Sequence, residues 1–289
     1  MKVNQFVLVF FLFLSANMVF AAHDPVSKGA KSAAMGGASV ASSDFWGVFN
    51  NPAVNAYIRD ISAGVYFENR FMLKELSYRG LGVLLPVAQH DAFALNVQQF
   101  GYAQFQESKV GLAYSKKFSE SFAAGLQFDY LNTFIGEGLG SKHSYTFEFG
   151  LYSKFNKKLS LGFLAFNPAR MKLTDYNGFN DYIPVVLKLG ARYAFSDRVS
   201  AISEVEKDIY RDAVLRLGLD YKLSEILYFR GGLSTGVVAY SFGMGVNYNS
   251  FMFDISTSVH QVLGPSPQVS LMYNFGRKTN KDKATNPSF

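Results

Sequence analysis

The chain has 289 residues, no cysteine and a formal net charge of +6. This length fits one large β domain or two ordinary domains, and the lack of cysteine excludes a disulfide framework and a cysteine-linked lipid anchor. Aromatic residues make up 16% and charged residues only 17%, whereas soluble globular proteins carry about 25% charged residues. The positive charge comes without a basic helix or an interleaved stacking motif, so we expect no nucleic-acid partner.

The amino terminus has the pattern of an export signal. Lys2 precedes an apolar run at residues 6–14, and the small residues that end at Ala21 suit cleavage by a signal peptidase. A membrane-spanning helix needs about 20 apolar residues, and no later stretch is long enough. We therefore predict a signal peptide at residues 1–21. If the mature chain is a membrane protein it must be a barrel, because only helices and closed barrels satisfy their backbone in lipid.

From residue 60 onward, apolar and polar residues alternate with a period of two. In residues 213–223 the odd positions are apolar, and the even positions include Arg216, Gly218 and Asp220. One face then suits lipid and the other suits water. A soluble sandwich also alternates, but most of the segments here reach the roughly 9–11 residues that a tilted transmembrane strand needs. The pattern predicts an all-β, antiparallel transmembrane barrel of about fourteen strands, at residues 61–71, 74–86, 91–101, 108–116, 122–133, 143–155, 159–167, 184–195, 199–207, 213–222, 226–234, 238–248, 251–259 and 267–276.

The expected connections differ in length on alternate sides. Those after even-numbered strands are short, and the longest, at residues 133–142, 168–183 and 261–266, follow odd-numbered strands. Bacterial barrels have short periplasmic turns and longer outer loops. The sequence therefore predicts an even-stranded barrel in the bacterial outer membrane, in contact with membrane lipids or lipopolysaccharide, with both termini in the periplasm.

Residues 29–56 are neither export signal nor alternating strand. Small residues come first, and Gly36 and Gly37 allow backbone dihedrals that other residues resist. We predict a hatch inside the barrel mouth at residues 22–58, a barrel at residues 59–276 and a basic flexible tail at residues 277–289. The expected hatch residues are Gly36, Gly37, Trp46, Asn50, Asn51 and Pro52.

The inner face is expected to carry charges of both signs. Buried charges are kept only when paired or hydrated, so we expect salt bridges that fill the lumen, with Arg216 and Asp220 as partners whose joint charge reversal restores stability. Glycines on the same face would leave room for the hatch. The charge network comprises Glu148, Lys188, Arg192, Arg216, Asp220 and Arg230, with Glu68, Arg70, Asp129, Glu204, Glu206 and Asp254 also inward, and the glycines are Gly125, Gly150, Gly190, Gly218, Gly243 and Gly245.

A motif in the hatch region resembles a known family. The pattern Gly-Ala-x-Ser-x-x-Met-Gly-Gly-Ala-x-Val-Ala at residues 29–41, followed by Asp44, Trp46 and Phe-Asn-Asn-Pro-Ala at residues 49–53, is similar to the amino-terminal region of the FadL-like superfamily, and within it to the smaller PorV/PorQ-like barrels. The resemblance implies a fourteen-stranded outer-membrane barrel with an inserted hatch. Members of the family take up hydrophobic molecules or act as accessory barrels in type IX protein secretion. This chain is shorter than the fatty-acid transporters, and its expected lumen is charged.

No catalytic, cofactor or metal pattern is convincing, so we expect a protein that is not an enzyme. The spacing of His23, His90, His143 and His260 matches no metal motif. Residues 175–181 offer oxygen ligands but lack the spacing of a calcium loop. A surface hydrolase that pairs a serine with His143 or His260 is the weakest alternative.

The preferred interpretation is a non-enzymatic accessory subunit of a larger outer-membrane machine. Protein secretion is the first choice for that machine, and barrel or surface-protein assembly is the second. Lipid-facing aromatics and the loop at residues 168–183 would dock another outer-membrane or surface protein. The alternative is a FadL-like channel for small hydrophobic or amphiphilic molecules. A hydrophobic inward-facing pocket above the hatch would favour the channel, whereas an exposed apolar groove on one barrel wall, with a filled lumen, would favour the accessory subunit.

Overall fold

The computed structural model describes residues 26–87, 89–136, 140–172, 183–235 and 240–276. The predicted signal peptide, the calcium-like segment at residues 175–181 and the predicted basic tail therefore lie outside the described residues. No helix in the described part of the chain is long and apolar enough to cross a membrane.

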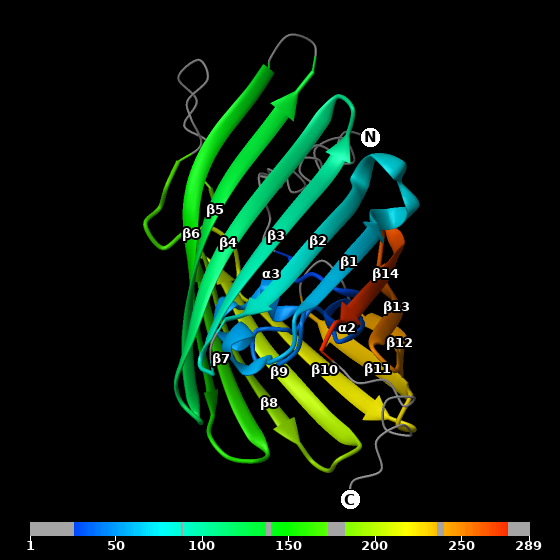
Figure 1. Ribbon diagram of the computed structural model, residues 1–289. Coiled ribbons are helices and arrows are strands. Elements are labelled where there is room, and N and C mark those ends of the chain that lie inside the picture. The colour runs from blue at the N-terminus through cyan, green and yellow to red at the C-terminus, as the bar shows by residue number, and fades with distance from the viewer. Residues whose placement is uncertain (1–25, 88, 137–139, 173–182, 236–239, 277–289) are drawn as a thin grey trace, which may run out of the picture.

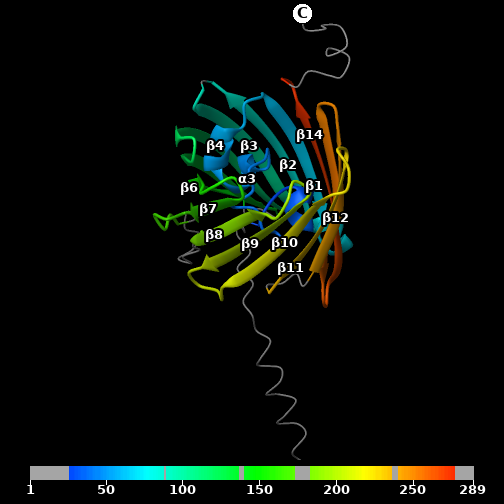
Figure 2. The ribbon, with the colours of Figure 1, turned by 90° about the horizontal axis from the view of Figure 1, so that it is seen from below.

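Fourteen antiparallel strands form one closed barrel (Figures 1 and 2). Each strand pairs with its neighbours in sequence, and β1 pairs with β14 to close the wall. The predicted fold class and strand number are confirmed, because the period-two pattern follows from the alternation of side chains across a sheet. The strands are β1 Ser62–Asn69, β2 Ser77–Pro86, β3 Asp91–Tyr102, β4 Phe105–Ser119, β5 Phe122–Ile135, β6 Gly140–Lys154, β7 Leu159–Phe166, β8 Val186–Ala194, β9 Val199–Asp208, β10 Val214–Lys222, β11 Leu227–Ser234, β12 Tyr240–Tyr248, β13 Phe251–His260 and β14 Gly264–Asn274.

Three connections between strands differ from the prediction. The chain between β1 and β2 forms two 3-10 turns, η2 Arg70–Met72 and η3 Lys74–Leu76. They replace the end of the predicted strand 61–71 and the start of the predicted strand 74–86. Two of the predicted long loops are wrong: β5 and β6 extend into residues 133–142, and β14 begins at Gly264 within residues 261–266. Polar residues and prolines are typical of loops, so those stretches were predicted as loops. They lie at the rim of the barrel, where a strand tolerates such residues because both of its faces meet water or one of its edges is unpaired.

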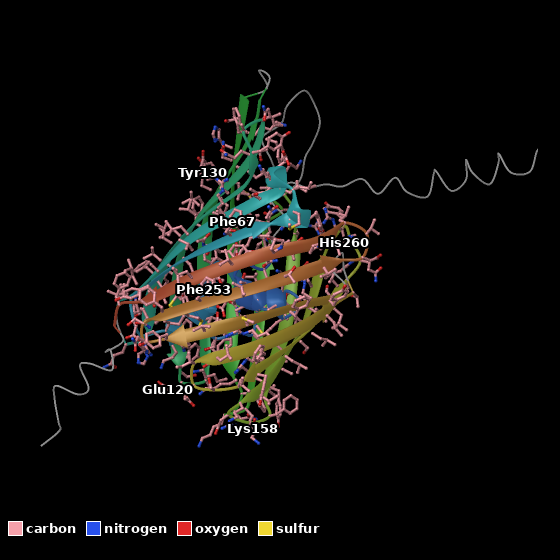
Figure 3. All side chains as sticks on the ribbon, turned by 90° about the vertical axis from the view of Figure 1, so that its right-hand side faces the viewer. Phe67, Glu120, Tyr130, Lys158, Phe253 and His260 are labelled. Atoms are coloured by element: carbon pink, nitrogen blue, oxygen red, sulfur yellow. The ribbon has the colours of Figure 1, made fainter. Side chains whose placement is uncertain are left out.

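The outer face of the barrel is apolar. Leu215, Leu217 and Leu219 on β10 are all well exposed, and the even positions between them point inward. Figure 3 shows Phe67 and Phe253 along the wall, and Glu120 and Lys158 at one end. An apolar band with polar ends is the arrangement that a barrel needs to cross a bilayer.

Residues 26–58, called the hatch segment below, lie inside this barrel. They contain α2 Ala30–Ala34, α3 Gly47–Asn50 and η1 Pro52–Tyr57, and Figures 1 and 2 show them enclosed by the strands. α2 contacts β11–β14, whereas η1 contacts β2–β6. The hatch segment therefore bridges opposite walls of the lumen.

Candidate functional site inside the barrel

Glycines on the inner wall make room for the hatch segment. A Cβ added at Gly218 would lie 2.5 Å from Met35 Cβ, and one at Gly232 would overlap the backbone nitrogen of Gly36. Gly36 itself has a φ of 71°, which favours glycine. Of the six predicted glycines, Gly125, Gly150, Gly190, Gly218 and Gly243 face the hatch segment, whereas Gly245 faces the Arg230–Asp254 ion pair.

Side chains of the wall hold the backbone of the hatch segment. Glu204 Oε2 accepts hydrogen bonds from the backbone N–H groups of Ser39 and Val40, at 2.7 and 2.8 Å. Ser241 Oγ accepts from the Gly36 N–H at 2.8 Å and donates to the Ala34 carbonyl at 3.0 Å. These contacts satisfy buried backbone groups that a helix or a sheet would otherwise pair.

Residues 50–52 link the later part of the hatch segment to its earlier part and to the barrel wall. The Asn50 amide exchanges two 2.8 Å hydrogen bonds with the backbone of Lys28. The Asn51 amide donates to the carbonyls of Val40 and Leu151, and the Pro52 carbonyl accepts from Ser115 Oγ at 2.6 Å. These three residues thus contact the earlier part of the hatch segment, β4 and β6, whereas Gly36 and Gly37 lie against β10 and β11 and Trp46 lies in the cluster described next.

Trp46 is the centre of an aromatic cluster at the base of the hatch segment. Its ring lies 5.3 Å from that of Phe45, 5.9 Å from that of Phe49 and 6.4 Å from that of Tyr66. Gly29, at φ 96°, passes so close that an added Cβ would lie 2.5 Å from Trp46 Cδ2. The cluster therefore fixes the start of the hatch segment against β1 through shape as well as burial.

One ion pair lies within the hatch segment. Lys31 Nζ is 2.8 Å from Asp44 Oδ2, and Asp44 also accepts from Ser42 Oγ and from the Trp46 N–H. Burial raises the pKa of the Asp44 carboxyl, but Lys31 and these hydrogen bonds outweigh it and hold the pKa below its ordinary value. Asp44 therefore stabilises the hatch segment beside the aromatic cluster as a charged carboxylate.

A cavity of about 270 Å³ lies between the hatch segment and the end of the barrel where odd-numbered strands connect to the next strand. The hatch segment forms its floor, and its walls mix carboxylates, guanidinium groups, hydroxyls and apolar side chains. Its volume is near the lower end of the roughly 300–1,000 Å³ of small-molecule sites. The lining residues are Val26, Ser27, Ala33, Gly36, Gly37, Glu68, Arg70, Phe71, Val186, Glu206, Asp208, Arg211, Asp212, Val214, Arg216, Ser234, Ser258, Ser266 and Gln268.

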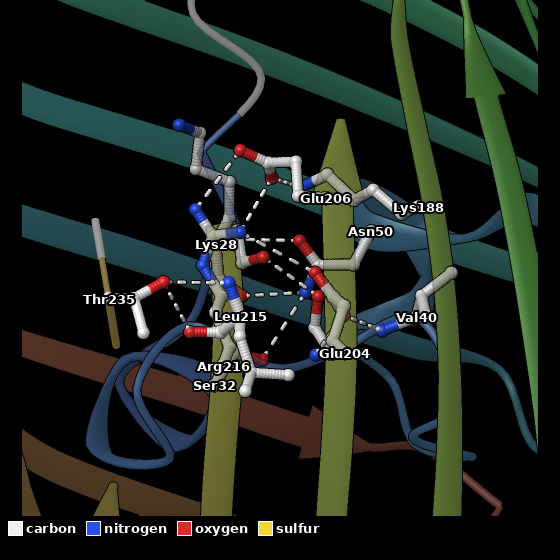
Figure 4. Close-up of polar contacts among 12 residues, drawn as sticks. Lys28, Ser32, Val40, Asn50, Lys188, Glu204, Glu206, Leu215, Arg216 and Thr235 are labelled. Atoms are coloured by element: carbon white, nitrogen blue, oxygen red, sulfur yellow. Dashed lines mark hydrogen bonds and ion pairs between the residues drawn. The ribbon is translucent and has the colours of Figure 1, made fainter. Parts of the chain in front are cut away.

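A network of four charged residues, Lys188, Glu204, Glu206 and Arg216, reaches this cavity through Glu206 and Arg216, which line it (Figure 4). Arg216 makes a bidentate contact with Glu206, at 2.7 and 3.1 Å, and lies 3.7 Å from Glu204. Lys188 Nζ contacts Glu206 at 2.9 Å. Glu206 is thus shared by two cations, and the arrangement links the cavity to the carboxylate of Glu204 that holds the hatch segment.

The remaining predicted network residues form separate pairs. Glu148 pairs with Lys109, which sequence reasoning missed although Lys109 shares the inward parity of β4. Arg192 donates to Ser200 Oγ at 3.0 Å. Arg230 contacts Asp220 at 3.0 Å and also pairs with Asp254.

The expected Arg216–Asp220 pair is wrong. These residues lie on the same face of β10, but Arg216 reaches β9 and Asp220 reaches β11. Cross-strand neighbours at about 5 Å are nearer than positions four apart along an extended strand, which rises roughly 3.3 Å per residue. Joint reversal of Arg216 and Asp220 would therefore leave both true partners mismatched.

Among the described residues, His143 and His260 contact no serine hydroxyl in the hydrogen bonds that the structure gives them. His143 Nδ1 lies 2.6 Å from the Tyr130 hydroxyl on the outer side of β5 and β6. His260 Nδ1 accepts from the N–H groups of Val262 and Leu263, so it caps the turn before β14. In the described ranges, no group of three or more His, Cys, Asp or Glu residues is placed to hold a metal ion.

A closed, even-stranded antiparallel barrel with an apolar outer face and a polar lumen defines a barrel of the outer-membrane type. The sequence itself matches no protein-family model and no curated protein.

The comparison with solved structures relates the fold to FadL-type barrels. The chain is similar to the CymD monoaromatic hydrocarbon channel, with a TM-score of 0.67, 13% identity and coverage of 88% of this chain and 99% of that chain. It is also similar to a FadL homologue of Pseudomonas aeruginosa (TM-score 0.64, 14% identity, 86% and 98% coverage) and to the toluene transporter TodX of Pseudomonas putida (0.64, 13%, 88% and 100%). At these identities the likeness establishes the shared fold.

Proposed function

We propose that this protein is an outer-membrane barrel that binds and passes small amphiphilic molecules. The cavity above the hatch segment carries this proposal, because it offers about 270 Å³ lined by both charged and apolar side chains. It differs from the purely hydrophobic pocket that the sequence analysis connected with a channel. Similarity to hydrocarbon channels supports the same class of protein. Orientation of the cavity toward the cell exterior, with periplasmic termini, is part of the proposal.

The lining indicates an amphiphile rather than a pure hydrocarbon. Val186 and Val214 provide apolar surface, whereas Arg216 and Glu206 present opposite charges at the same cavity. A charged group of a ligand is costly to bury unless a side chain of opposite charge pairs with it. A molecule with one polar end and one apolar end matches both parts of this wall.

Saturation-transfer NMR with phenylacetate and with neutral ethylbenzene as probes tests the proposal on the purified protein in nanodiscs. Val214→Trp fills the cavity and should abolish binding of phenylacetate, the favoured probe. Val205→Trp, on the lipid-facing side of β9, is the matched control and should bind like the wild type. Failure of both probes to bind the wild type, or equal binding by the two variants, would refute this function.

An accessory role in a larger outer-membrane machine, including the PorV/PorQ-like role in type IX secretion, is the second candidate. The observation that favours it is a lumen that the hatch segment crosses and that ion pairs between nearby wall strands line. Purification from the native membrane in mild detergent separates the two candidates. A large protein recovered in stoichiometric amount favours the accessory role, and a lone barrel with a bound amphiphile favours passage.

A further inference from the structure

A row of polar side chains lies on the outward face of the neighbouring strands β2–β6, near the end of the barrel that carries the cavity. Each member is directly opposite the next in the antiparallel register, so together they form one line across the wall. This line, called the polar row below, comprises Arg79, Gln99, Ser108, Asn132 and His143. The members share the parity of exposed apolar residues such as Leu81 on β2 and Leu112 on β4, so they lie on the outward side of the wall.

The polar row marks where the apolar outer wall ends. One outward position closer to the middle of the strands lie Leu81, Val97, Val110, Tyr130 and Tyr145, and the next outward positions are again apolar. Figure 3 shows Tyr130 at the end of the barrel opposite Glu120 and Lys158. Tyrosine gathers at the level of lipid head groups, because its ring is apolar and its hydroxyl is polar. The polar row therefore lies at head-group level when the adjoining apolar wall faces acyl chains.

Other strands of the wall keep apolar residues up to the same end of the barrel. The outward residues nearest that end are Leu187 on β8, Leu215 on β10 and Leu233 on β11, and all three are well exposed. Contact with water at the rim therefore does not by itself explain the polar row. The row distinguishes one sector of the wall, which suits a polar partner.

Arg79 brings a positive charge to this sector. Its direct neighbours across the strands are Phe67 on β1 and Gln99 on β3, and neither side chain can neutralise a guanidinium group. A charged side chain on the lipid-facing side of a barrel is costly unless it lies near the interface. The planar guanidinium group matches the oxygens of a phosphate through two parallel hydrogen bonds. A phosphate at head-group level is thus the partner that suits Arg79.

The other side chains of the polar row offer amide, hydroxyl and imidazole groups. His143 Nδ1 lies 2.6 Å from the Tyr130 hydroxyl and 2.9 Å from Asn132 Nδ2. The imidazole ring also stacks on that of Tyr130, at an interplanar angle of 16°, so these contacts hold it in place on the wall. Side chains with both donors and acceptors can form hydrogen bonds with the hydroxyl groups of a sugar.

The length of the polar row fits a wide head group. Neighbouring strands lie about 4.8 Å apart, so the row spans about 19 Å from Arg79 to His143. A glycerophospholipid has one phosphate and two acyl chains, so it covers only part of this length. A disaccharide that carries phosphates and several acyl chains covers more of the row and more of the apolar wall beside it.

We propose that the polar row is a binding site for a phosphorylated glycolipid of the outer leaflet, the lipid A part of lipopolysaccharide. A phosphate pairs with Arg79, the sugars lie over the middle of the row, and the acyl chains follow the apolar wall. This site lies on the outside of the barrel and goes beyond the proposed function. It shares with that function only the orientation in which the end with the cavity faces the cell exterior.

Native mass spectrometry of the purified protein in nanodiscs tests the site. The bilayer contains phosphatidylcholine with equal small amounts of lipid A and phosphatidylglycerol, and the lipids that stay bound after release of the bilayer are counted. We expect the wild type to retain lipid A in preference to phosphatidylglycerol. Arg79→Gln should retain about tenfold less lipid A, because a charge-assisted contact is lost. Arg79→Lys should lose less, since lysine keeps the charge but not the paired hydrogen bonds.

Lys116→Gln is the matched control. Lys116 is an exposed, outward cation at the opposite end of β4, 3.7 Å from Asp91, so its loss should leave the retention of lipid A unchanged. Lipid A stripped of its phosphates is the control on the side of the ligand, because Arg79→Gln and the wild type should retain it equally. Heat-modifiable mobility on a gel shows that each variant is folded. Equal retention of phosphatidylglycerol and lipid A by the wild type, or equal losses in Arg79→Gln and Lys116→Gln, would overturn the glycolipid site.

A second pair of variants tests the middle of the polar row. Ser108→Leu extends the apolar wall into the row and should lower the retention of lipid A by about threefold, because a sugar hydroxyl loses its partner. Ser203→Leu, at an outward position of β9, is its control and should bind like the wild type. Equal retention by these two variants would contradict a sugar bound along the row.

Failure of this site and failure of the proposed function give different results. Retention of lipid A without binding of phenylacetate would refute the proposed function and leave the glycolipid site standing. Binding of phenylacetate without retention of lipid A would refute only the glycolipid site.

Discussion

Two buried asparagines in the hatch segment show what a single side chain contributes. Asn51 and Asn55 are both fully buried. The Asn51 amide donates to the carbonyls of Val40 and Leu151, and its oxygen accepts from the Ala53 N–H. The amide atoms of Asn55 make no hydrogen bond to the described residues. The two positions therefore differ in hydrogen bonding more than in burial.

Alanine substitution should separate these effects. Asn51→Ala leaves two carbonyls and one N–H without a partner, whereas Asn55→Ala mainly removes volume. We expect Asn51→Ala to lower the free energy of unfolding by about 2 kcal/mol more than Asn55→Ala. Urea unfolding followed by emission of Trp46, the only tryptophan, measures the difference. Equal effects would mean that the bonds of Asn51 contribute nothing net.

The Lys31–Asp44 pair predicts a dependence on pH. Because the pKa of Asp44 is lowered in the folded protein, the unfolded chain binds more protons near and below the ordinary aspartate pKa of about 3.9. The contribution of Asp44 is complete above that pH and is lost as the pH falls through the folded value. Asp44→Asn should lower the urea midpoint of Trp46 emission at pH 7 and flatten its decline at acid pH.

Glu225→Gln is the control for Asp44→Asn. Glu225 pairs with Lys222 in an exposed turn, so its loss should leave the Trp46 midpoint unchanged, as expected for surface ion pairs. An unaltered acid decline in Asp44→Asn would assign that decline to other carboxylates.

At the residue scale, the sequence predicted which side of the barrel wall a side chain faces better than it predicted which residue that side chain pairs with. Alternation alone places Arg216, Asp220 and Arg230 inward, and the structure agrees. Which charge meets which depends on the register between strands, and alternation carries no register. For this reason the Arg216–Asp220 pair was wrong. Lys109 is different, because its inward position on β4 follows from alternation and only its pairing with Glu148 depends on the register.

At the scale of elements, β11 has one face packed against the hatch segment and the other face with free space beside it. Gly231 and Gly232 are adjacent, and a Cβ at Gly231 would meet its nearest neighbour only at 3.9 Å, whereas one at Gly232 would overlap the hatch segment. Gly232→Val should therefore displace the hatch segment and shift Trp46 emission to the red. Gly231→Val should be tolerated, because a β-branched residue suits a strand.

Limited proteolysis of the two variants checks the same expectation independently. Cleavage near Lys28 and Lys31 should appear in Gly232→Val and be absent in Gly231→Val. Equal protection of both variants would show that the hatch segment adapts to the added volume.

The elements were largely predictable, and their ends were not. Strands such as β10 follow from strict alternation, because one face meets lipid and the other meets polar groups. The end of β1 was placed at residue 71 because Arg70 and Phe71 continue the polar and apolar alternation of the strand. Only the structure shows Phe71 in the 3-10 turn η2, where its N–H donates to Ser266 of β14.

For the whole molecule, closure of the barrel wall does not depend on the segment that fills the lumen. The strand pairings run around the full barrel and use none of residues 26–58. A variant that lacks residues 26–56 should therefore still fold, as judged by heat-modifiable mobility on a gel. Its emptied lumen should conduct ions across a planar bilayer well above the level of the full-length protein. A folded but non-conducting variant would show that another part of the chain seals the lumen.

The position of the hatch segment also constrains the order of assembly. Ala30 N–H donates to Ser270 Oγ on β14, and Asn51 reaches the Leu151 carbonyl on β6, so residues made first touch residues made last. Contacts of such sequence separation form late. The hatch segment must already lie within the curling sheet when β1 meets β14, since afterwards the wall encloses it. Any factor that catalyses the pairing of β1 with β14 would therefore also decide whether the closed barrel contains the hatch segment or has an empty lumen.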